Sequence, residues 1–192
     1  KIASQYSIFQ NEILQSSESQ AVNMNRGKSN FEDRIRVAMQ LLQGLSIQQN
    51  ENYEKLAKDI KLVLRTIIGK ILETENNFYK SADYEICLMY LRKLLISFAS
   101  RSASKDRLNV FTTNYDRFIE LGADSAGLFT VDRFRGTIKP KLRSSRMSLD
   151  FHYDPPGIRG EPRYLEGVIR LTKLHGSLDW KFDNGNIIKY PL

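Results

Sequence analysis

Cysteine is almost absent from this chain of 192 residues, because Cys87 is the only one. A single cysteine excludes an intrachain disulfide and any zinc site built from several cysteines. Long apolar runs are also missing, so no segment is expected to cross a membrane, and no secretory signal pattern opens the sequence. These absences predict a cytoplasmic protein. Cys87 lies in a helix-like pattern without a neighbouring histidine, and we expect it to be buried and unreactive.

Several motifs that would identify an enzyme class are missing too. The two histidines, His152 and His175, lie far apart without carboxylate-rich spacing around them, which argues against a metal site. No G-x-S-x-G turn indicates a Ser-His-Asp hydrolase. No G-x-G-x-x-G loop is present for binding phosphates. Residues 157–160 (Gly-Ile-Arg-Gly) are no substitute, because neither a strand nor a helix is predicted beside them.

Positive charge, by contrast, is in excess. Lysine and arginine number 29 against 22 aspartates and glutamates, and the formal net charge is +7. The stretch from Arg133 to Arg146 carries six cations and no acidic residue. Exposed basic runs are commonly solvated loops, and the functional alternative is a contact with phosphates or nucleic acid. Only Phe134 and Phe151 lie in or near the stretch, so a stacking platform for bases is poorly supported.

The first half of the chain is predicted to be helical. Residues 1–28 are rich in glutamine, serine and asparagine and predict a short helix followed by a loop. Ser29 and Glu32 form a capping-box pattern, and Ser81 is a candidate N-cap. Apolar stripes predict helices over residues 30–44, 50–74 and 82–101. We expect residues 30–101 to form a helical subdomain whose apolar surface makes subunit contacts.

The second half alternates strand and helix patterns. Strands are predicted at Leu108–Thr112, Phe129–Val131 and Val168–Leu174, with a helix from Tyr115 to Ser125. Asn184-Gly185 predicts a hairpin turn. Residues 139–162 hold four of the five prolines and predict a long irregular excursion. These patterns favour an α/β fold with a parallel sheet. Because the chain lacks an initial methionine and stops after a hairpin pattern, we expect residues 1–192 to be one incomplete domain, with 108–192 as its nucleotide-fold part.

Two motifs carry the strongest functional signal. The first, Phe-Thr-Thr-Asn-Tyr-Asp at residues 111–116, ends one predicted strand, and Lys-Leu-His-Gly-Ser-Leu-Asp-Trp at residues 173–180 ends another. Ligands of open α/β sheets sit beyond the carboxyl ends of strands, so both motifs point to one pocket. Structural alternatives exist for each. Asn114 could be a helix N-cap with Asp116 in the first turn, and His175 could be an ordinary polar loop residue.

Together the motifs resemble the sirtuin-like NAD-consuming family. The resemblance covers residues 108–190, with a looser match at residues 30–33, and implies a sirtuin-type Rossmann-like sheet, NAD as substrate and no metal. By resemblance, Asn114 positions an attacking water and stabilises the ribosyl centre, and His175 binds the ribose hydroxyls and acts as general base. The resemblance also implies that Asp116 contacts the nicotinamide carboxamide or holds its loop. The remaining expected contacts to NAD are Thr112, Thr113 and Gly176.

Two departures from the family pattern refine the expected reaction. Protein-deacetylating sirtuins carry a four-cysteine zinc module after their His-Gly, whereas here a tight hairpin pattern follows at residues 183–186. Water is therefore favoured over acetyl-lysine as the acceptor.

The reaction itself needs little acid catalysis, because the nicotinamide that leaves is neutral. The pair of carboxylates that glycosidases use is therefore unnecessary. The family's Gly-rich phosphate loop is missing. It either precedes Lys1 in a longer protein, or nucleotide binding has been lost.

The resemblance implies an NAD hydrolase that releases nicotinamide and ADP-ribose. Bacterial proteins with similar motifs act as antiphage-defence effectors, as oligomers or with a partner ATPase, nuclease or Argonaute-like protein. The alternative is a catalytically silent sirtuin-like module that binds NAD or ADP-ribose, or that scaffolds a nucleic-acid-handling partner through the Arg133–Arg146 stretch. A third reading, a nucleic-acid-binding protein outright, depends only on charge.

Overall fold

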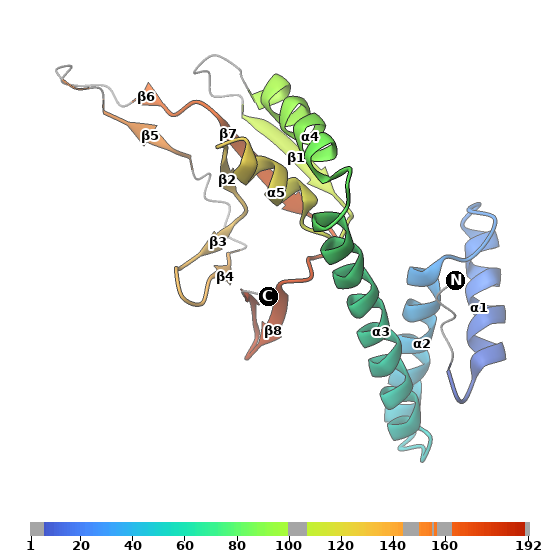
Figure 1. Ribbon diagram of the computed structural model, residues 1–192. Helices are drawn as coiled ribbons and strands as arrows, with labels where there is room; N and C mark the ends of the chain where they lie inside the picture. Colours follow the sequence, from blue (N-terminus) through green and yellow to red (C-terminus); the bar gives the residue numbers. More distant parts are fainter. Residues whose placement is uncertain (1–5, 100–106, 144–149, 155, 157–162, 191–192) are drawn as a thin grey trace. The chain divides into compact units, whose positions relative to one another are not determined.

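The computed structural model describes residues 6–99, 107–143, 150–154, 156 and 163–190 (Figure 1). The chain divides into two compact units, Lys1–Lys70 and Ile71–Leu192. The division falls within one helix, α3 (Tyr53–Tyr79). The two units are described separately below. Arg101, Arg146 and residues 157–160, which figure in the sequence predictions, lie outside the described residues.

The first unit is an assembly of helices around one apolar core. It contains α1 (Gln10–Asn23), α2 (Phe31–Ile47) and most of α3. On α3, Leu56, Ile60 and Val63 recur at intervals of three and four, the spacing that places side chains on one helix face. They pack with α1 and α2 side chains in a buried cluster. The helices predicted at 30–44 and 50–74 are therefore present, each ending later than predicted.

Helix α2 begins one residue later than its predicted capping box. Asn30 is the N-cap. Its side chain accepts a hydrogen bond from the Asp33 N–H at 2.9 Å, and the Asp33 carboxylate accepts one from the Asn30 N–H at 3.0 Å. The prediction of Ser29 and Glu32 as the capping pair was wrong. Ser29 instead donates both its N–H, at 3.0 Å, and its hydroxyl, at 2.8 Å, to the Glu18 carboxylate.

Asp33 also forms ion pairs with two arginines of this unit. Its carboxylate is buried and contacts Arg26 at 2.5 Å and Arg36 at 3.0 Å. The hydrogen bond from Arg26, with that from the Asn30 N–H, lowers the pKa of Asp33 below its ordinary value. A carboxyl whose pKa is lowered by folding stabilises the folded state at pH values above its unfolded pKa of about 4.

We expect this stabilisation to be present above about pH 5 and to be lost as the pH falls from about 4 through the lower pKa of the folded state. Chemical denaturation of the wild type and of Asp33→Asn, followed by helical ellipticity, measures it. The difference between the two midpoints should shrink between pH 5 and pH 3. A difference that stays constant over this range would contradict the assignment.

The second unit contains the end of α3 and α4 (Tyr84–Ala99), the helix predicted at 82–101. Helix α4 starts three residues after Ser81, the predicted N-cap, and the Ser81 hydroxyl donates to the Phe78 carbonyl at 2.9 Å. Leu88 and Leu95 of α4 are buried, whereas its apolar stripe of Ile86, Tyr90, Leu94 and Phe98 is exposed. Cys87 is exposed as well, so the prediction of a buried cysteine was wrong.

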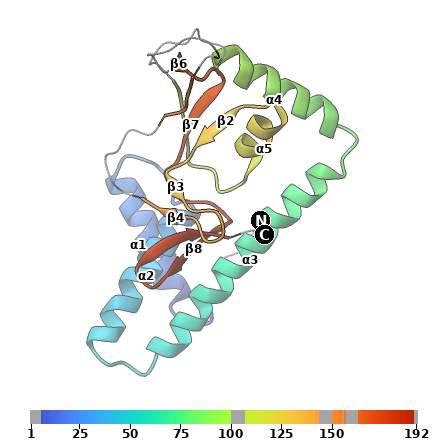
Figure 2. The same ribbon diagram turned by 90° about the vertical axis from the view of Figure 1, so that its left-hand side faces the viewer.

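The core of the second unit is a parallel sheet with helices on one face. Strands β1 (Leu108–Thr112), β7 (Val168–Lys173) and β2 (Phe129–Val131) lie in the order β1-β7-β2, all parallel. Helix α5 (Phe118–Ser125) joins β1 to β2. Figure 2 shows α4 and α5 beside these strands. Buried residues of both helices and of β7 form the core, namely Leu95, Ala99, Ala123 and Ile169. The expected mixed α/β class with a parallel sheet is confirmed.

A second, antiparallel sheet follows in the order β3-β4-β9-β8. Its strands are β3 (Phe134–Arg135), β4 (Lys141–Leu142), β8 (Trp180–Asp183) and β9 (Asn186–Lys189). The hairpin predicted at Asn184-Gly185 joins β8 to β9. Both turn residues have positive φ angles, 46° and 79°, as the favoured two-residue hairpin turn requires.

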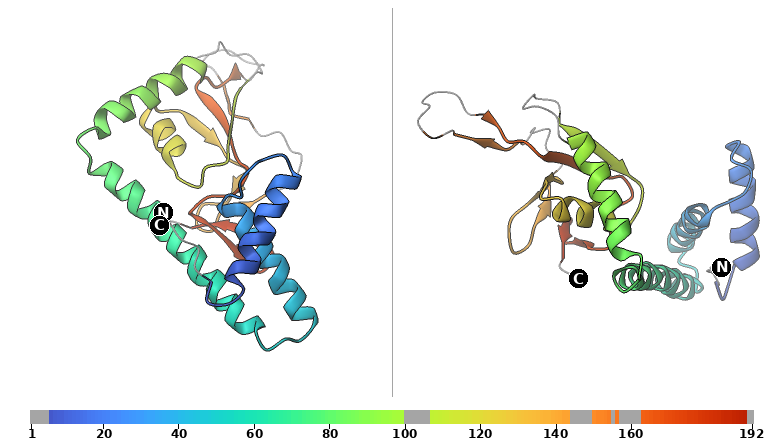
Figure 3. Two further views of the ribbon diagram at one scale, coloured as in Figure 1. Left: turned by 90° about the vertical axis from the view of Figure 1, so that its right-hand side faces the viewer. Right: turned by 45° about the horizontal axis from the view of Figure 1, so that its top comes forward.

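The excursion predicted over residues 139–162 is not wholly irregular. It supplies β4 to the second sheet, and it supplies β5 (His152–Tyr153), which pairs with β6 (Arg163–Tyr164). Figure 3 shows the β5–β6 pair extending from the end of the parallel sheet. Strands of two residues carry no measurable periodicity, so the sequence pattern could not reveal β4, β5 or β6. Over the described residues, no helix is long and apolar enough to span a bilayer.

Candidate functional site

The two sequence motifs meet at the carboxyl edge of the parallel sheet. Strands β1 and β7 are neighbours, and their last residues, Thr112 and Lys173, are paired in register. The Leu174 N–H donates to the Thr112 carbonyl at 2.9 Å. The loop that follows β1 and the loop that follows β7 therefore leave the sheet side by side. This edge is where ligands of parallel α/β sheets bind.

Asn114 and His175 occupy equivalent positions in these loops, because each lies two residues beyond the paired strand ends. Both side chains are exposed. The Asn114 N–H donates to the Thr112 hydroxyl at 3.0 Å, which fixes the backbone as it leaves β1. The rings of Tyr115 and His175 contact each other with centroids 6.1 Å apart. The two motifs therefore lie next to each other, as predicted from their positions at the ends of two strands.

The structural alternative for Asn114 is wrong. Helix α5 starts at Phe118 rather than Tyr115, its N-cap is Arg117, and Asn114 lies outside the cap. Asp116 accounts for the delay, since its carboxylate accepts the Phe118 N–H at 3.2 Å and forms a local turn. Asn114 is therefore an exposed amide that capping does not explain.

Gly176 follows His175 in a conformation that favours glycine. Its φ is 90°, in the region that side chains of L-residues rarely adopt. A Cβ built at this position would lie 3.6 Å from the Trp180 ring, which is ordinary contact, so the backbone angle and not crowding selects glycine. Gly176 lets the chain turn sharply after His175. This explains the residue structurally, and its predicted contact with NAD stays a prediction.

The buried side chain of Lys173, the last residue of β7, forms hydrogen bonds to both loops. Its side chain is 3% exposed, and its ammonium donates to the Asp116 carbonyl and, at 3.2 Å, to the Ser177 hydroxyl. It also contacts the Glu120 carboxylate at 3.0 Å. Burial raises the pKa of Glu120 in spite of this lysine. Sequence reasoning missed Lys173 as a site residue. The signal was its place in the alternation Ile169-x-Leu171-x-Lys173, which puts it on the buried face of β7.

Glu75 of α3 binds Arg117, the residue at which the loop after β1 leads into α5. It is 1% exposed and accepts three hydrogen bonds from Arg117: from the backbone N–H at 2.7 Å, from Nε at 3.2 Å and from a terminal nitrogen at 2.7 Å. It therefore satisfies the start of α5, where Arg117 supplies no side-chain cap. The hydrogen bond with Glu75 raises the pKa of Arg117. Nothing in the local sequence pattern links two residues so far apart.

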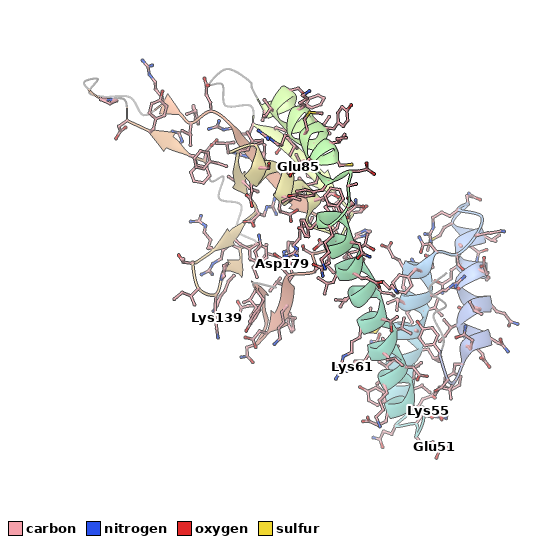
Figure 4. The ribbon with its side chains drawn as sticks, in the orientation of Figure 1. Glu51, Lys55, Lys61, Glu85, Lys139 and Asp179 are labelled. Atoms are coloured by element: carbon pink, nitrogen blue, oxygen red, sulfur yellow. The ribbon has the colours of Figure 1, made fainter. Side chains whose placement is uncertain are left out.

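A second group of charged residues lies around Lys189, the last residue of β9. Lys189 contacts the Asp132 carboxylate at 2.8 Å and that of Asp179 at 3.9 Å. Burial acts to lower the pKa of Lys189, but the hydrogen bond to Asp132 and the negative charges of Asp132, Asp179 and Glu120 together outweigh it, so the pKa is raised. One carboxylate oxygen of Asp179 is buried and has no hydrogen-bond partner among the described residues. Figure 4 shows Asp179 in the interior of this unit.

The described residues hold no group of three or more His, Cys, Asp or Glu side chains placed to bind a metal ion. An open groove in the first unit is lined by α2 residues and Tyr53, and none of the predicted site residues contributes to it. The exposed polar side chains of the two loops include the amide of Asn114, the imidazole of His175 and the hydroxyl of Thr113.

Comparison with known proteins adds no identification. The chain matches no protein-family model and no curated protein sequence.

Proposed function

We propose that this chain belongs to a sirtuin-like domain that hydrolyses NAD to nicotinamide and ADP-ribose. The observation that carries the proposal is the adjacency of two loops, one bearing Asn114 and the other His175, at the carboxyl edge of neighbouring parallel strands. Neither side chain is needed to cap a helix, and both face solvent. A substrate arriving from that side meets both groups.

In the proposed reaction the bond between C1′ of the ribose and the nicotinamide nitrogen breaks, and its electron pair neutralises the pyridinium. The ribosyl centre is then attacked by water, whose proton passes to His175 and on to solvent. Asn114 holds the water and faces the cationic centre. General base catalysis of this kind contributes about 10²–10⁴-fold. Correct placement of the water contributes further, because it removes the entropic cost of bringing the reactants together.

The remaining predicted residues have supporting roles. The Asp116 carboxylate is occupied by the Phe118 N–H, and its carbonyl accepts from Lys173, which favours loop positioning over direct contact with the carboxamide. Thr112 uses its hydroxyl to fix Asn114, and Thr113 lies exposed beside it. Gly176 provides the turn after His175.

The site also fits a second function, in which the domain binds NAD or ADP-ribose without turning it over. The sequence has no Gly-rich loop to hold the pyrophosphate, and this observation favours the silent module. In either case, we propose a cytoplasmic antiphage-defence role, with the domain acting as an oligomer or with a partner ATPase or nuclease.

One experiment separates the two functions. The full-length protein is incubated with NAD, with and without nucleic acid, and nicotinamide and ADP-ribose are quantified by chromatography. We expect equimolar release of both products. Binding of NAD by calorimetry without product would establish the silent module. Absence of both binding and turnover under every condition would refute the proposed site.

A further inference from the structure

The Arg133–Arg146 stretch, read from sequence as a loop, forms a β-hairpin over its described part. Strands β3 and β4 pair Phe134 with Leu142 and Arg135 with Lys141. The Arg143 N–H donates to the Arg133 carbonyl at 3.1 Å, just beyond these two pairs. The cations are thus fixed on a two-stranded scaffold.

Directly opposed residues of an antiparallel pair point to the same face of the sheet. Arg135 therefore lies beside Lys141, a like-charged pair on one face, and Arg133 and Arg143 follow just beyond the paired residues, joined by a backbone hydrogen bond. Opposed like charges destabilise a sheet. Arg133 also has a φ of 66°, an unfavourable angle for a residue with a side chain. The isolated hairpin therefore carries an electrostatic and a conformational cost, and an anionic partner would relieve the first.

No internal anion relieves it among the described residues. All five cations on the described hairpin are exposed, and none forms an ion pair with a described carboxylate: Arg133, Arg135, Lys139, Lys141 and Arg143. The nearest acid in sequence, Asp132, is occupied by Lys189 at 2.8 Å and by the Phe134 N–H at 3.1 Å. The charge is available to an external ligand.

Protection of an exposed sheet edge does not explain this arrangement. Edge strands commonly carry lysine because charge discourages pairing with another chain. Here β3 is the edge strand, whereas β4 is paired on both sides, with β3 and with β9. Lys141 and Arg143, on the β4 side, protect no edge. Edge protection therefore does not explain why these two positions carry positive charge.

The tip of the hairpin adds an apolar element. Ile138 is 89% exposed, and Lys139 follows it. Figure 4 shows Lys139 at the free end of the hairpin. The major groove of a duplex admits a two-stranded β-ribbon, and proteins that bend duplexes often insert an apolar side chain between base steps. A single strand fits less well, because the hairpin's one aromatic side chain, Phe134, packs on Trp180 with ring centroids 5.0 Å apart.

We propose that the β3–β4 hairpin binds double-stranded nucleic acid, with its cations on backbone phosphates and Ile138 directed into a groove. The proposal is independent of NAD hydrolysis, since the hairpin cations contact none of the residues assigned to that reaction in the described structure.

The test is a fluorescence-anisotropy titration of the full-length protein with a mixed-sequence duplex over a range of salt concentrations. The variant is Arg135→Gln/Lys141→Gln. Its control, Lys55→Gln/Lys61→Gln, removes the same charge from exposed positions on α3 (Figure 4). The hairpin variant should bind about tenfold or more weakly at low salt, and its plot of log K against log salt should be shallower by about 0.9 for each lost phosphate contact. The control should match the wild type.

A second variant, Ile138→Ser, should weaken duplex binding without changing the salt slope, since no charge is removed. Parallel titrations use the single strand and vesicles of phosphatidylserine and phosphatidylcholine. The proposal is overturned if the wild type does not bind the duplex, if the control variant loses as much affinity as the hairpin variant, or if the vesicles bind and the duplex does not.

Discussion

Replacing His175 with alanine is expected to lower nicotinamide release from NAD by about 10²-fold or more, the usual range for loss of a general base. His175 lies on the loop after β7, beside Tyr115 and across from the loop that bears Asn114. In the proposed reaction, loss of the imidazole removes the group that takes the proton from the attacking water. The fall should appear mainly in kcat, because the proton is transferred only in the transition state.

The chain offers a matched control in its other histidine, His152, which is exposed on β5 and contacts Tyr164 with ring centroids 4.4 Å apart. His152→Ala should retain the wild-type rate. Asn114→Ala should lose activity as His175→Ala does, whereas Asn186→Ala, at an exposed asparagine of β9, should not. Steady-state assays of nicotinamide release measure all four. Wild-type activity in His175→Ala, or equal loss in His152→Ala, would remove the assignment.

Replacing Glu75 with alanine is expected to destabilise the second unit by about 1.5–3 kcal/mol, the range for losing hydrogen bonds to a charged group. The substitution leaves the Arg117 guanidinium, whose side chain is 29% exposed, without its carboxylate, and leaves the Arg117 N–H at the start of α5 without its acceptor. Because Arg117 closes the loop that begins at Thr113, Asn114 should also be displaced and NAD turnover should fall.

Denaturant unfolding followed by circular dichroism measures the loss. Glu75→Gln should be less damaging, because its amide oxygen still accepts the Arg117 N–H. Glu85→Ala, at an exposed glutamate of α4, removes the same charge and should leave the midpoint unchanged (Figure 4). A Glu75→Ala midpoint equal to that of Glu85→Ala would show that the contact contributes nothing.

The elements that the sequence predicted well are those marked by a local run or repeat of apolar residues. Helices α2, α3 and α4 each repeat apolar residues over several turns, and β1 and β2 appear at their predicted residues. Their ends were less certain. The N-cap of α2 is Asn30 rather than the predicted Ser29, because two neighbouring residues of types that favour N-caps could each fill this position.

The features that escaped prediction depend on contacts between distant residues. Glu75 and Arg117 are ordinary charged residues in sequence, and only folding brings them together. The exposure of Cys87 depends on which face of α4 meets α5, which periodicity alone does not choose. The pairing of Thr112 with Lys173 was predictable only as a consequence of parallel strands ending at one edge.

Lys173 illustrates how the shape of a charged group can matter as much as its sign. An ammonium has three N–H donors directed to the corners of a tetrahedron, and this one meets three acceptors from separate segments: the carbonyl of Asp116, the hydroxyl of Ser177 and the carboxylate of Glu120. A guanidinium is flat, longer and suited to paired acceptors lying in one plane. Lysine and arginine are therefore not equivalent at this strand end, although each would bring the same unit of charge.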